Sequence, residues 1–241
     1  MNTQPTQSKT IRAQLLTAMR SGEYADCQRL PRENVLSEHL GISRTQLRDI
    51  LASLEREGFI TRRHGVGTVI NRHVLGVQTR IDIEVEFLDM IRQNGHQPDV
   101  AFVRVSESTA DQHIAQQLRL EEGTPIIRIA RLCTADGRPA IYCEDVIEKA
   151  LAKGEYTIQD LKRPIFHFLQ QFCGVYPYMD LTDLRAVTAD AALSEVLQVP
   201  VGTPLLNMEE VDFDISGRPV FWSNEYFVDG IFRNTVMRKK L

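Results

Sequence analysis

The sequence predicts an α+β protein with two modules. The first is a small N-terminal module of helices and a hairpin, and the second is an antiparallel sheet with helices packed on it. Helical periodicity over residues 9–57, followed by a glycine-containing hairpin pattern, predicts the first module. A repeat in which residues 109–132 recur as 188–211 predicts the second, because each copy contains one helix and two long strands.

The composition is that of an ordinary globular protein. Of 241 residues, 43% are hydrophobic and 25% are charged. There is no long apolar run and the N-terminus is polar, so we expect neither a membrane span nor a signal peptide. The four cysteines are scattered without a CxxC pair, which favours a reduced, cytoplasmic protein. The six histidines have no metal-ligand spacing, so we expect no metal and no cofactor.

Charge is divided unevenly along the chain. Residues 1–73 hold 11 of the 28 Lys and Arg but only 7 of the 32 Asp and Glu, a local charge of +4. The rest of the chain holds 17 basic and 25 acidic residues, a local charge of −8. A basic module joined to an acidic one suggests a polyanion partner at one end, although chance fluctuation alone could produce a charge of +4.

The first helix is predicted over residues 9–20, and Gly22 and Pro31 mark a non-helical segment after it. A short helix over about 33–39 ends at Gly41, a suitable residue just past a helix end. Ser43 is a suitable N-cap for the third helix. That helix has apolar residues spaced i, i+3, i+4 and i+7: Leu47, Ile50, Leu51 and Leu54.

The segment after the third helix predicts a small hairpin. Gly58 ends the helix, and "FITRRHGVGTVI" alternates around a Gly-x-Gly tip. Three helices followed by a hairpin is the order of a winged helix-turn-helix, in which the third helix enters the DNA major groove. The alternative is a solvated basic face with a glycine-containing hairpin.

The polar side of the third helix has the chemistry for DNA recognition. Arg44, Thr45 and Arg48 lie near its N-terminus, opposite the apolar stripe. Arginine can donate two parallel hydrogen bonds to guanine or hold a phosphate, and free N–H groups at a helix start can bind phosphate. At the hairpin tip, Gly65 and Gly67 let the backbone approach a groove, with Arg63 and His64 beside them.

The segment "LPRENVLSEHLGISRTQLRDILASLEREGFITRRHGVGTVI" resembles the N-terminal signature of the GntR family of bacterial transcription regulators. The resemblance implies DNA contacts from Arg44, Thr45, Arg48, His64 and Gly65. Asn34 and Gln46 depart from the family pattern, which affects the expected operator sequence. The full set of predicted DNA-binding residues is Arg32, Asn34, Ser43, Arg44, Thr45, Gln46, Arg48, Arg63, His64, Gly65 and Gly67.

The second module is defined by its repeat. Thr109-Ala110-Asp111 recurs as Thr188-Ala189-Asp190, and Gly123-Thr124-Pro125 recurs as Gly202-Thr203-Pro204. Gly137-Arg138-Pro139 recurs as Gly217-Arg218-Pro219. Each copy predicts a helix, a tight turn and two long strands rich in β-branched and aromatic residues. The predicted boundaries are 1–72 for the first module, 73–80 for a linker and 81–241 for the second.

The second module resembles the effector domain of the HutC subfamily, the UTRA domain. The resemblance rests on "LxLxxGTPIIRIARL", "DGRPAIYCEDV", "DLKRPIFHFLQQFCG" and "GRPVFWSNEYF". It implies a chorismate-lyase-like fold that binds a small-molecule effector and dimerises. Members that bind sugar phosphates have further polar residues where this chain has Cys133, Pro164 and Gly230. A sugar-phosphate effector is therefore less expected.

Arg131 and Glu144 are the first candidates for effector binding, on adjacent strands of one predicted hairpin. Arg131 would pair with an anionic group and Glu144 would accept a hydrogen bond from a hydroxyl or amine. A cross-strand salt bridge between the two is an equally good interpretation. Weaker candidates for the pocket wall are Phe166, His167, Trp222 and Tyr226.

These features together predict a transcription repressor and not an enzyme. We expect a homodimer that binds a two-fold double-stranded DNA operator and responds to a small-molecule effector, with an anionic metabolite as one candidate class, and no membrane partner. Two alternatives stay open: an enzyme of chorismate-lyase-like fold, and a DNA-binding protein that needs no ligand. No nucleophile–base pair or paired carboxylates stand out in support of the enzyme.

Overall fold

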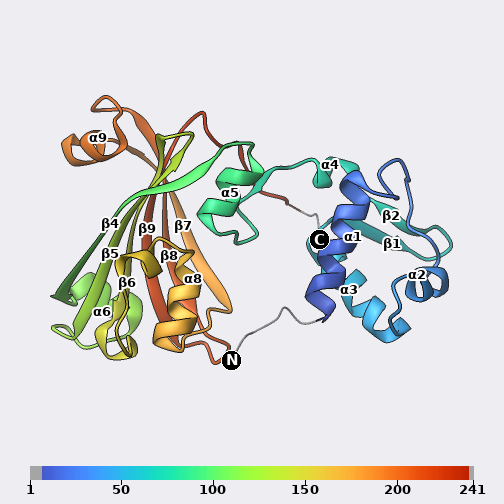
Figure 1. Cartoon of the computed structure of the whole chain (residues 1–241), viewed down its shortest axis with the longest axis horizontal. Helices are drawn as coiled ribbons and strands as arrows, with labels where there is room; N and C mark the ends of the chain where they lie inside the picture. Colours follow the sequence, from blue (N-terminus) through green and yellow to red (C-terminus); the bar gives the residue numbers. More distant parts are fainter. Residues whose placement is uncertain (1–6, 239–241) are drawn as a thin grey trace. The chain divides into compact units, whose positions relative to one another are not determined.

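The computed structural model describes residues 7–238, which form two compact units (Figure 1). The first unit contains the described residues up to Glu84 together with those from Asn234 onward. The second unit runs from Val85 to Arg233. Both the helical first unit and the antiparallel sheet of the second confirm the α+β class.

The first unit contains the predicted helices and hairpin. Its helices are α1 (Gln7–Ser21), α2 (Glu33–His39) and α3 (Arg44–Arg56), and β1 (Ile60–Arg63) pairs antiparallel with β2 (Gly67–Ile70). The apolar stripe of α3 is buried as predicted: Leu47, Ile50, Leu51 and Leu54 are each at most 4% exposed. Burying such side chains at about 25 cal/mol per Å² supplies several kcal/mol, so this stripe fixes which side of α3 faces outward.

The first unit extends beyond the predicted boundary at residue 72. The expected linker forms helix α4 (Arg72–Leu75) and strand β3 (Thr79–Arg80), and β10 (Asn234–Thr235) pairs with β3 in parallel. Val74 and Leu75 complete the apolar core, which explains why this segment is ordered on the first unit. The segment expected as a linker and the described residues from Asn234 onward therefore lie within the first compact unit.

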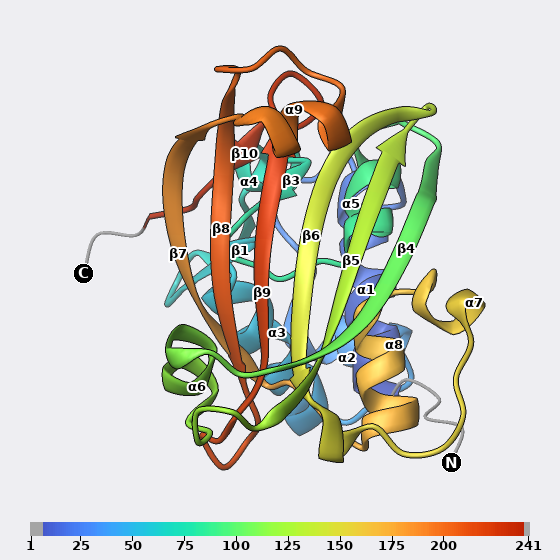
Figure 2. The same cartoon turned by 90° about the vertical axis from the view of Figure 1, so that its left-hand side faces the viewer.

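The second unit contains one six-stranded antiparallel sheet in the order β4-β5-β6-β9-β8-β7 (Figure 2). Its strands are β4 (Pro98–Thr109), β5 (Pro125–Ala135), β6 (Arg138–Glu148), β7 (Met179–Thr188), β8 (Pro204–Phe213) and β9 (Pro219–Val228). The helical segments are α5 (Phe87–Gln93), α6 (Gln112–Leu118), η1 (Lys149–Leu151), α7 (Ile158–Leu161), α8 (Ile165–Phe168), η2 (Leu169–Cys173) and α9 (Ala191–Leu197).

The structure shows the duplication directly. β4-α6-β5-β6 and β7-α9-β8-β9 have the same order, and β6 pairs with β9 at the centre of the sheet. Asp111 caps α6 by accepting a hydrogen bond from the backbone N–H of Ile114 at 2.9 Å. Asp190 caps α9 in the same way from Leu193 at 2.8 Å. Each copy also begins with a strand that the repeat alone did not predict, β4 in the first and β7 in the second.

The two faces of this sheet are covered by different helices (Figures 1 and 2). On one, called here the α6/α9 face, α6 packs against Trp222 and α9 against Leu132. On the other, the α5/α8 face, Ile127, Ile129 and Ile147 pack against Ile165 and other residues of α8 and η2. Residues opposite one another in neighbouring strands share a face, so the register assigns each polar side chain to one of them.

Candidate functional site

The N-terminus of α3 presents the predicted DNA-reading residues to solvent. The hydroxyl of Ser43 accepts from the backbone N–H of Gln46 at 3.1 Å, which caps the helix and fixes its start. Arg44, Thr45 and Arg48 are exposed, whereas the intervening Leu47 is fully buried. The helix is thus held by its apolar side while a hydroxyl and two guanidinium groups face outward.

Two of the predicted residues have partners within the unit. Arg48 Nε lies 2.8 Å from Glu33 Oε2, in an ion pair whose arginine side chain is 64% exposed. Such an exposed pair is weak and can exchange for a phosphate. Gln46 is half-buried and its amide donates to the hydroxyl of Ser8 at 3.3 Å. Gln46 therefore contacts α1, whereas Arg48 extends outward.

The hairpin tip has the expected shape. Gly65 and Gly67 have φ angles of +77° and +93°, which side-chain-bearing residues rarely adopt. Arg63 and His64 beside them are exposed. Arg62 is different, because its Nε donates to Glu55 at 2.8 Å and so fastens the hairpin to α3. Arg62 therefore has a structural role, whereas Arg63 and His64 point outward.

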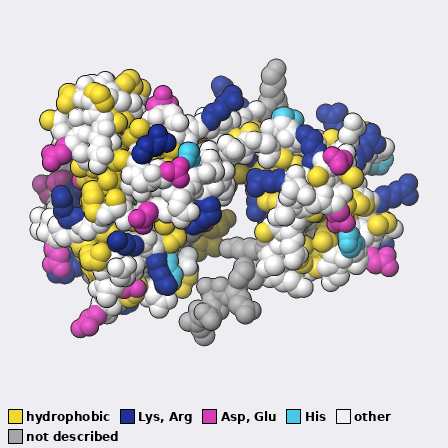
Figure 3. All heavy atoms as spheres, turned by 45° about the horizontal axis from the view of Figure 1, so that its top comes forward, with side chains coloured by type: hydrophobic (Ala, Val, Ile, Leu, Met, Phe, Trp, Pro, Cys, Tyr) yellow, Lys and Arg dark blue, Asp and Glu magenta, His cyan; other side chains and the backbone are white. Residues whose placement is uncertain are grey.

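Arg32 and Asn34 are exposed at the start of α2. Lys and Arg side chains gather on the visible surface of the first unit (Figure 3). The structure thus leaves Arg32, Asn34, Arg44, Thr45, Arg48, Arg63 and His64 accessible from solvent.

In the second unit, Arg131 lies on the α5/α8 face and is only 3% exposed. Its Nε and Nη2 each lie 2.9 Å from Oδ2 of Asp145, which is 1% exposed. The hydroxyl of Ser223 lies 3.0 Å from the other carboxylate oxygen of Asp145. The cross-strand salt bridge between Arg131 and Glu144 that the sequence suggested is therefore absent, and Arg131 pairs with Asp145 instead.

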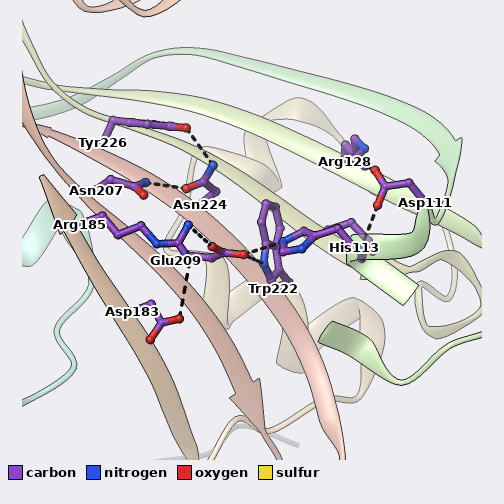
Figure 4. A network of polar contacts seen from close by, with 11 residues as sticks. Asp111, His113, Arg128, Asp183, Arg185, Asn207, Glu209, Trp222, Asn224 and Tyr226 are labelled. Carbon is purple, nitrogen blue, oxygen red and sulfur yellow. Dashed lines mark hydrogen bonds and ion pairs between the residues drawn. The ribbon is translucent and has the colours of Figure 1, made fainter. Parts of the chain in front are cut away.

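Glu144 lies on the opposite face of the sheet from Arg131. It is registered with Ala130, whereas Arg131 is registered with Cys143. The Tyr142 hydroxyl donates to Glu144 at 2.8 Å. Tyr226 is on this α6/α9 face too, where its hydroxyl accepts from Asn224 at 2.9 Å (Figure 4). The structure therefore does not bring Arg131 and Glu144 together.

The remaining pocket candidates are also separated. Trp222 is 5% exposed in the apolar cluster under α6, and its indole N–H donates to Glu209 at 3.2 Å. His113 and Arg185 also bind Glu209, at 2.6 and 3.0 Å (Figure 4). A cavity of about 430 Å³ beside α6 is lined in part by Glu209 but by none of the predicted effector residues.

Phe166 and His167 lie within α8, on the other face of the sheet. The backbone N–H of Phe166 donates to a carboxylate oxygen of Glu86 at 3.3 Å. His167 Nε2 lies 2.9 Å from Arg163, one turn earlier in the chain. Phe166 is therefore linked to Arg131 through Glu86, whose pKa Arg131 lowers. His167 has no such link among the described residues.

The sequence interpretation missed three further acids near Arg131: Glu86, Asp145 and Glu225. Burial raises the pKa of Glu86 to about 7, against the opposing attraction of Arg131. Burial, reinforced by Glu210 and Asp145, raises the pKa of Glu225 well above its ordinary value. Burial lowers the pKa of Arg131, but Asp145 together with Cys143, Cys133 and Glu86 outweighs it and keeps the guanidinium pKa above its ordinary value.

Within residues 7–238, no group of three or more His, Cys, Asp or Glu side chains is arranged to hold a metal ion. No helix in this described part of the chain is long and apolar enough to cross a membrane.

A capped helix with outward polar residues and a glycine-tipped hairpin, joined to a duplicated sheet with a buried polar cluster, is typical of a DNA-binding regulator with a sensing domain. Comparison with known proteins identifies its family. Residues 93–232 match the UTRA domain, and residues 7–70 match the family described as bacterial regulatory proteins, gntR family. The chain belongs to the GntR regulators with a UTRA effector-binding domain, and it is a transcriptional regulator of the HutC-like type and not an enzyme.

Relatives of known name agree with this assignment. The HTH-type transcriptional regulator GgaR of Escherichia coli is 25% identical over 206 residues, covering 86% of this chain and 80% of the relative. The histidine utilization repressor of Pseudomonas putida is 24% identical over 197 residues, covering 81% and 77%. The crystal structure of YydK from Bacillus subtilis, a possible transcriptional regulator, has the same fold. It has a TM-score of 0.77 at 18% identity and covers 97% of this chain and 99% of that one.

Proposed function

We propose that this regulator is a homodimeric repressor whose α3 helices read a two-fold operator and whose UTRA domain binds a small-molecule effector. The observation that carries the proposal is the outward display of Arg44, Thr45 and Arg48 from a helix clamped by a buried stripe. One of the relatives, in Pseudomonas putida, is named a repressor. Because the proposed partner is chromosomal DNA, we expect the protein in the cytoplasm.

The DNA-binding proposal is tested with duplexes selected from a random library by the wild-type protein. Arg44→Ala and Arg48→Ala should each weaken binding by about 1–3 kcal/mol if they contact bases. If they hold phosphates instead, each substitution should flatten the salt dependence, by about 0.9 in the log–log slope for each phosphate that is no longer neutralised. Arg56→Ala is the matched control, because it removes the same charge from the opposite end of α3. Unchanged affinity of the Arg44, Arg48 double variant would remove α3 from the reading role.

We propose that the hairpin of β1 and β2 adds contacts to a DNA groove through Arg63 and His64, next to Gly65 and Gly67. Arg32 and Asn34 would contact the DNA backbone beside α3. Ser43 would act mainly by fixing the first turn of α3. Gln46 contributes to reading only after it leaves Ser8, so its replacement by alanine should affect operator affinity less than that of Arg44.

We propose that dimerisation uses the sheet of the second unit, at edge strand β7. This strand pairs only with β8 in the described structure, and it exposes Met179, Leu181 and Leu184 by 53%, 67% and 51%. Exposed apolar side chains on a long edge strand favour association with another chain. Sedimentation velocity of Leu181→Lys with Leu184→Lys should show a monomer. Ile215→Lys, which changes a residue 83% exposed in a turn, should leave the dimer intact.

Effector control means that a ligand of the second unit changes operator affinity, typically by 1–3 kcal/mol. It is measured as the shift in operator affinity caused by each compound that raises the melting temperature of the second unit. A compound that binds without changing operator affinity would favour a DNA-binding protein that needs no ligand. Repression is tested with a reporter whose promoter overlaps the selected operator.

A further inference from the structure

The cavity of about 430 Å³ on the α6/α9 face lies apart from the residues that the sequence suggested for effector binding. Its lining includes Gln117 and Arg119 at the end of α6, Leu181 of β7, and Val211 and Phe213 of β8. Leu181 also belongs to the edge proposed for dimerisation. Small-molecule sites have volumes of about 300–1,000 Å³, so this cavity has room for a small ligand.

Arg119 is the cation of this lining that lacks an acid. Among the described residues, no carboxylate forms an ion pair with it. Its guanidinium carbon lies 5.9 Å from the centre of the Phe213 ring, and one nitrogen lies 3.4 Å from the backbone oxygen of Gly217. A guanidinium has five N–H donors, so most of its donor capacity remains for a ligand.

The partly buried acid in the same lining is already bound by donors. The side chain of Glu209 is 10% exposed, and Arg185 lies 3.0 Å from one of its oxygens (Figure 4). His113 and the indole N–H of Trp222 lie 2.6 and 3.2 Å from the other oxygen. The second acid, Asp183, has an 80% exposed side chain, 3.7 Å from Arg185. An anion that enters the cavity therefore meets an arginine without an acid, and no bare buried carboxylate.

The duplication shows that the fold does not require this polar network. The helices and the first two strands of the two copies correspond at an offset of 79 residues. His113, Arg185 and Glu209 therefore correspond to three small side chains, Ala192, Ser106 and Ala130. Arg119 corresponds to Gln198, which ends α9 with the same left-handed backbone. The charged groups beside α6 are thus additions to a shared framework.

The half of the sheet under α9 also has no apolar gap at the matching positions. Gln117, Leu181 and Val211 of the cavity lining correspond to Val196, Phe102 and Leu132. All three of these counterparts belong to one apolar cluster. Phe102 is half-buried, with its ring centre 6.4 Å from that of Tyr142, whereas Leu181 is 67% exposed. The same framework is therefore packed with apolar side chains under α9 and lined by mixed groups under α6.

We propose that the cavity beside α6 binds a small organic carboxylate. Its charged end pairs with Arg119, and its apolar part lies against the apolar side chains of β7 and β8. A guanidinium can bind a carboxylate through two parallel hydrogen bonds, and the amide of Gln117 can donate another. A cationic ligand would instead have to displace Arg185 from Glu209 or Asp183. The inference gives the proposed effector function a site and a ligand class, and it rests on that function for its regulatory meaning.

The proposal is tested on the full chain with size-matched probes at constant ionic strength. Phenylacetate and hexanoate are compared with two neutral amides, phenylacetamide and hexanamide, and with two amines, 2-phenylethylamine and hexylamine. Ligand-observed NMR gives the affinities. The carboxylates should bind with a Kd of about 10 mM or tighter, and at least about tenfold more tightly than the amides and amines. Weaker carboxylate binding, or amides or amines that bind as tightly, would overturn the proposal.

Trp222 locates the bound probe. It is the single tryptophan of the chain, so a ¹⁵N-labelled sample gives one indole N–H resonance, from the group that donates to Glu209 in the cavity lining. That resonance should shift with each carboxylate and saturate at the measured Kd. Carboxylate binding that leaves the resonance in place would assign the probe to another part of the molecule and contradict the inference.

Variants of Arg119 test the pairing itself. Arg119→Met should weaken carboxylate binding at least about tenfold, because a charge-assisted hydrogen bond is lost. It should not lower the melting temperature, because no ion pair is broken. Arg119→Lys keeps the charge and should restore part of the affinity. Arg138→Met removes an exposed arginine from the hairpin turn of the first copy and should leave binding unaltered. Wild-type affinity in Arg119→Met would refute the site.

Failure of this inference and failure of the proposed function have different signatures. If no carboxylate binds, but another compound binds the second unit and changes operator affinity, effector control stands and the inference is wrong. If carboxylates bind at Arg119 and operator affinity never changes, the site stands and effector control through it fails.

Discussion

Replacing Arg131 with methionine tests how the second unit holds its buried charge. Arg131 and Asp145 are 3% and 1% exposed, and two nitrogens of the guanidinium lie 2.9 Å from the same oxygen. Removing one partner of such a buried pair costs about 3–5 kcal/mol, because the other charge is left without compensation. Methionine keeps most of the volume, so little of the cost comes from a cavity.

The cost of Arg131→Met should depend on pH. Arg131 lowers the pKa of Asp145, Glu86 and Glu225, so its removal raises all three in the folded chain. A carboxyl whose folded pKa is raised gives stability that is present below its unfolded pKa, about 4–4.5, and is lost as pH rises through the folded value. The variant should therefore be closer to wild type at pH 5.5 than at pH 8. Each carboxyl contributes about 1.4 kcal/mol for every pH unit over which only the folded chain keeps its proton.

Trp222 provides the assay. It is the single tryptophan of the chain, it is 5% exposed, and it lies in the second unit, so its fluorescence during urea unfolding follows that unit. Arg128→Met is the matched control on the same strand, because the Arg128 side chain is 29% exposed in a 3.5 Å pair with Asp111. Arg128→Met should lower the free energy of unfolding by no more than about 1 kcal/mol. The reasoning is refuted if Arg131→Met lowers the free energy of unfolding by less than about 1 kcal/mol, or by the same amount at pH 5.5 and pH 8.

Four further variants test the local structure. Ser43→Ala should destabilise the start of α3 by about 1 kcal/mol, measured as faster amide exchange of Gln46. Gly67→Ala should strain the hairpin at its φ of +93° by at least about 1 kcal/mol, measured as faster exchange in β2. Asp111→Ala and Asp190→Ala should each cost about 1 kcal/mol by Trp222 fluorescence, because the two caps have the same geometry. Unequal costs would show that the two copies are not equivalent in stability.

The first unit could be predicted almost residue by residue, because its signals are local. The Ser43 cap, the Gly41 end and the apolar stripe of α3 depend on neighbours within one or two helical turns, and the structure has each of them. The pairing that holds the segment after residue 72 on the first unit could not be predicted, for the opposite reason. β3 and β10 are two residues long and lie about 155 positions apart in sequence, so no local pattern indicates their pairing.

The buried cluster could not be predicted because a strand alternates faces at every residue. In "IYCEDV", Glu144 and Asp145 are adjacent acids, and only the register with β5 decides which of them meets Arg131. The hairpin shifts register between Cys133 and Thr134, so counting back from the Gly137 turn does not give the pairing. The sequence did not predict strand β7, the first strand of the second copy. Its apolar residues, such as Leu181 and Leu184, are exposed and do not follow a one-sided burial pattern.

The two copies have kept the residues that fold them and have diverged in the polar residues of the sheet. Thr124 and Thr203 each close the turn after their helix with a 2.7 Å hydrogen bond to a carbonyl three residues earlier. The corresponding polar residues of the sheet, Arg131 and Glu210, instead carry opposite charges. Because the folding contacts match, the halves can pair about β6 and β9 while the site at their junction remains electrically asymmetric.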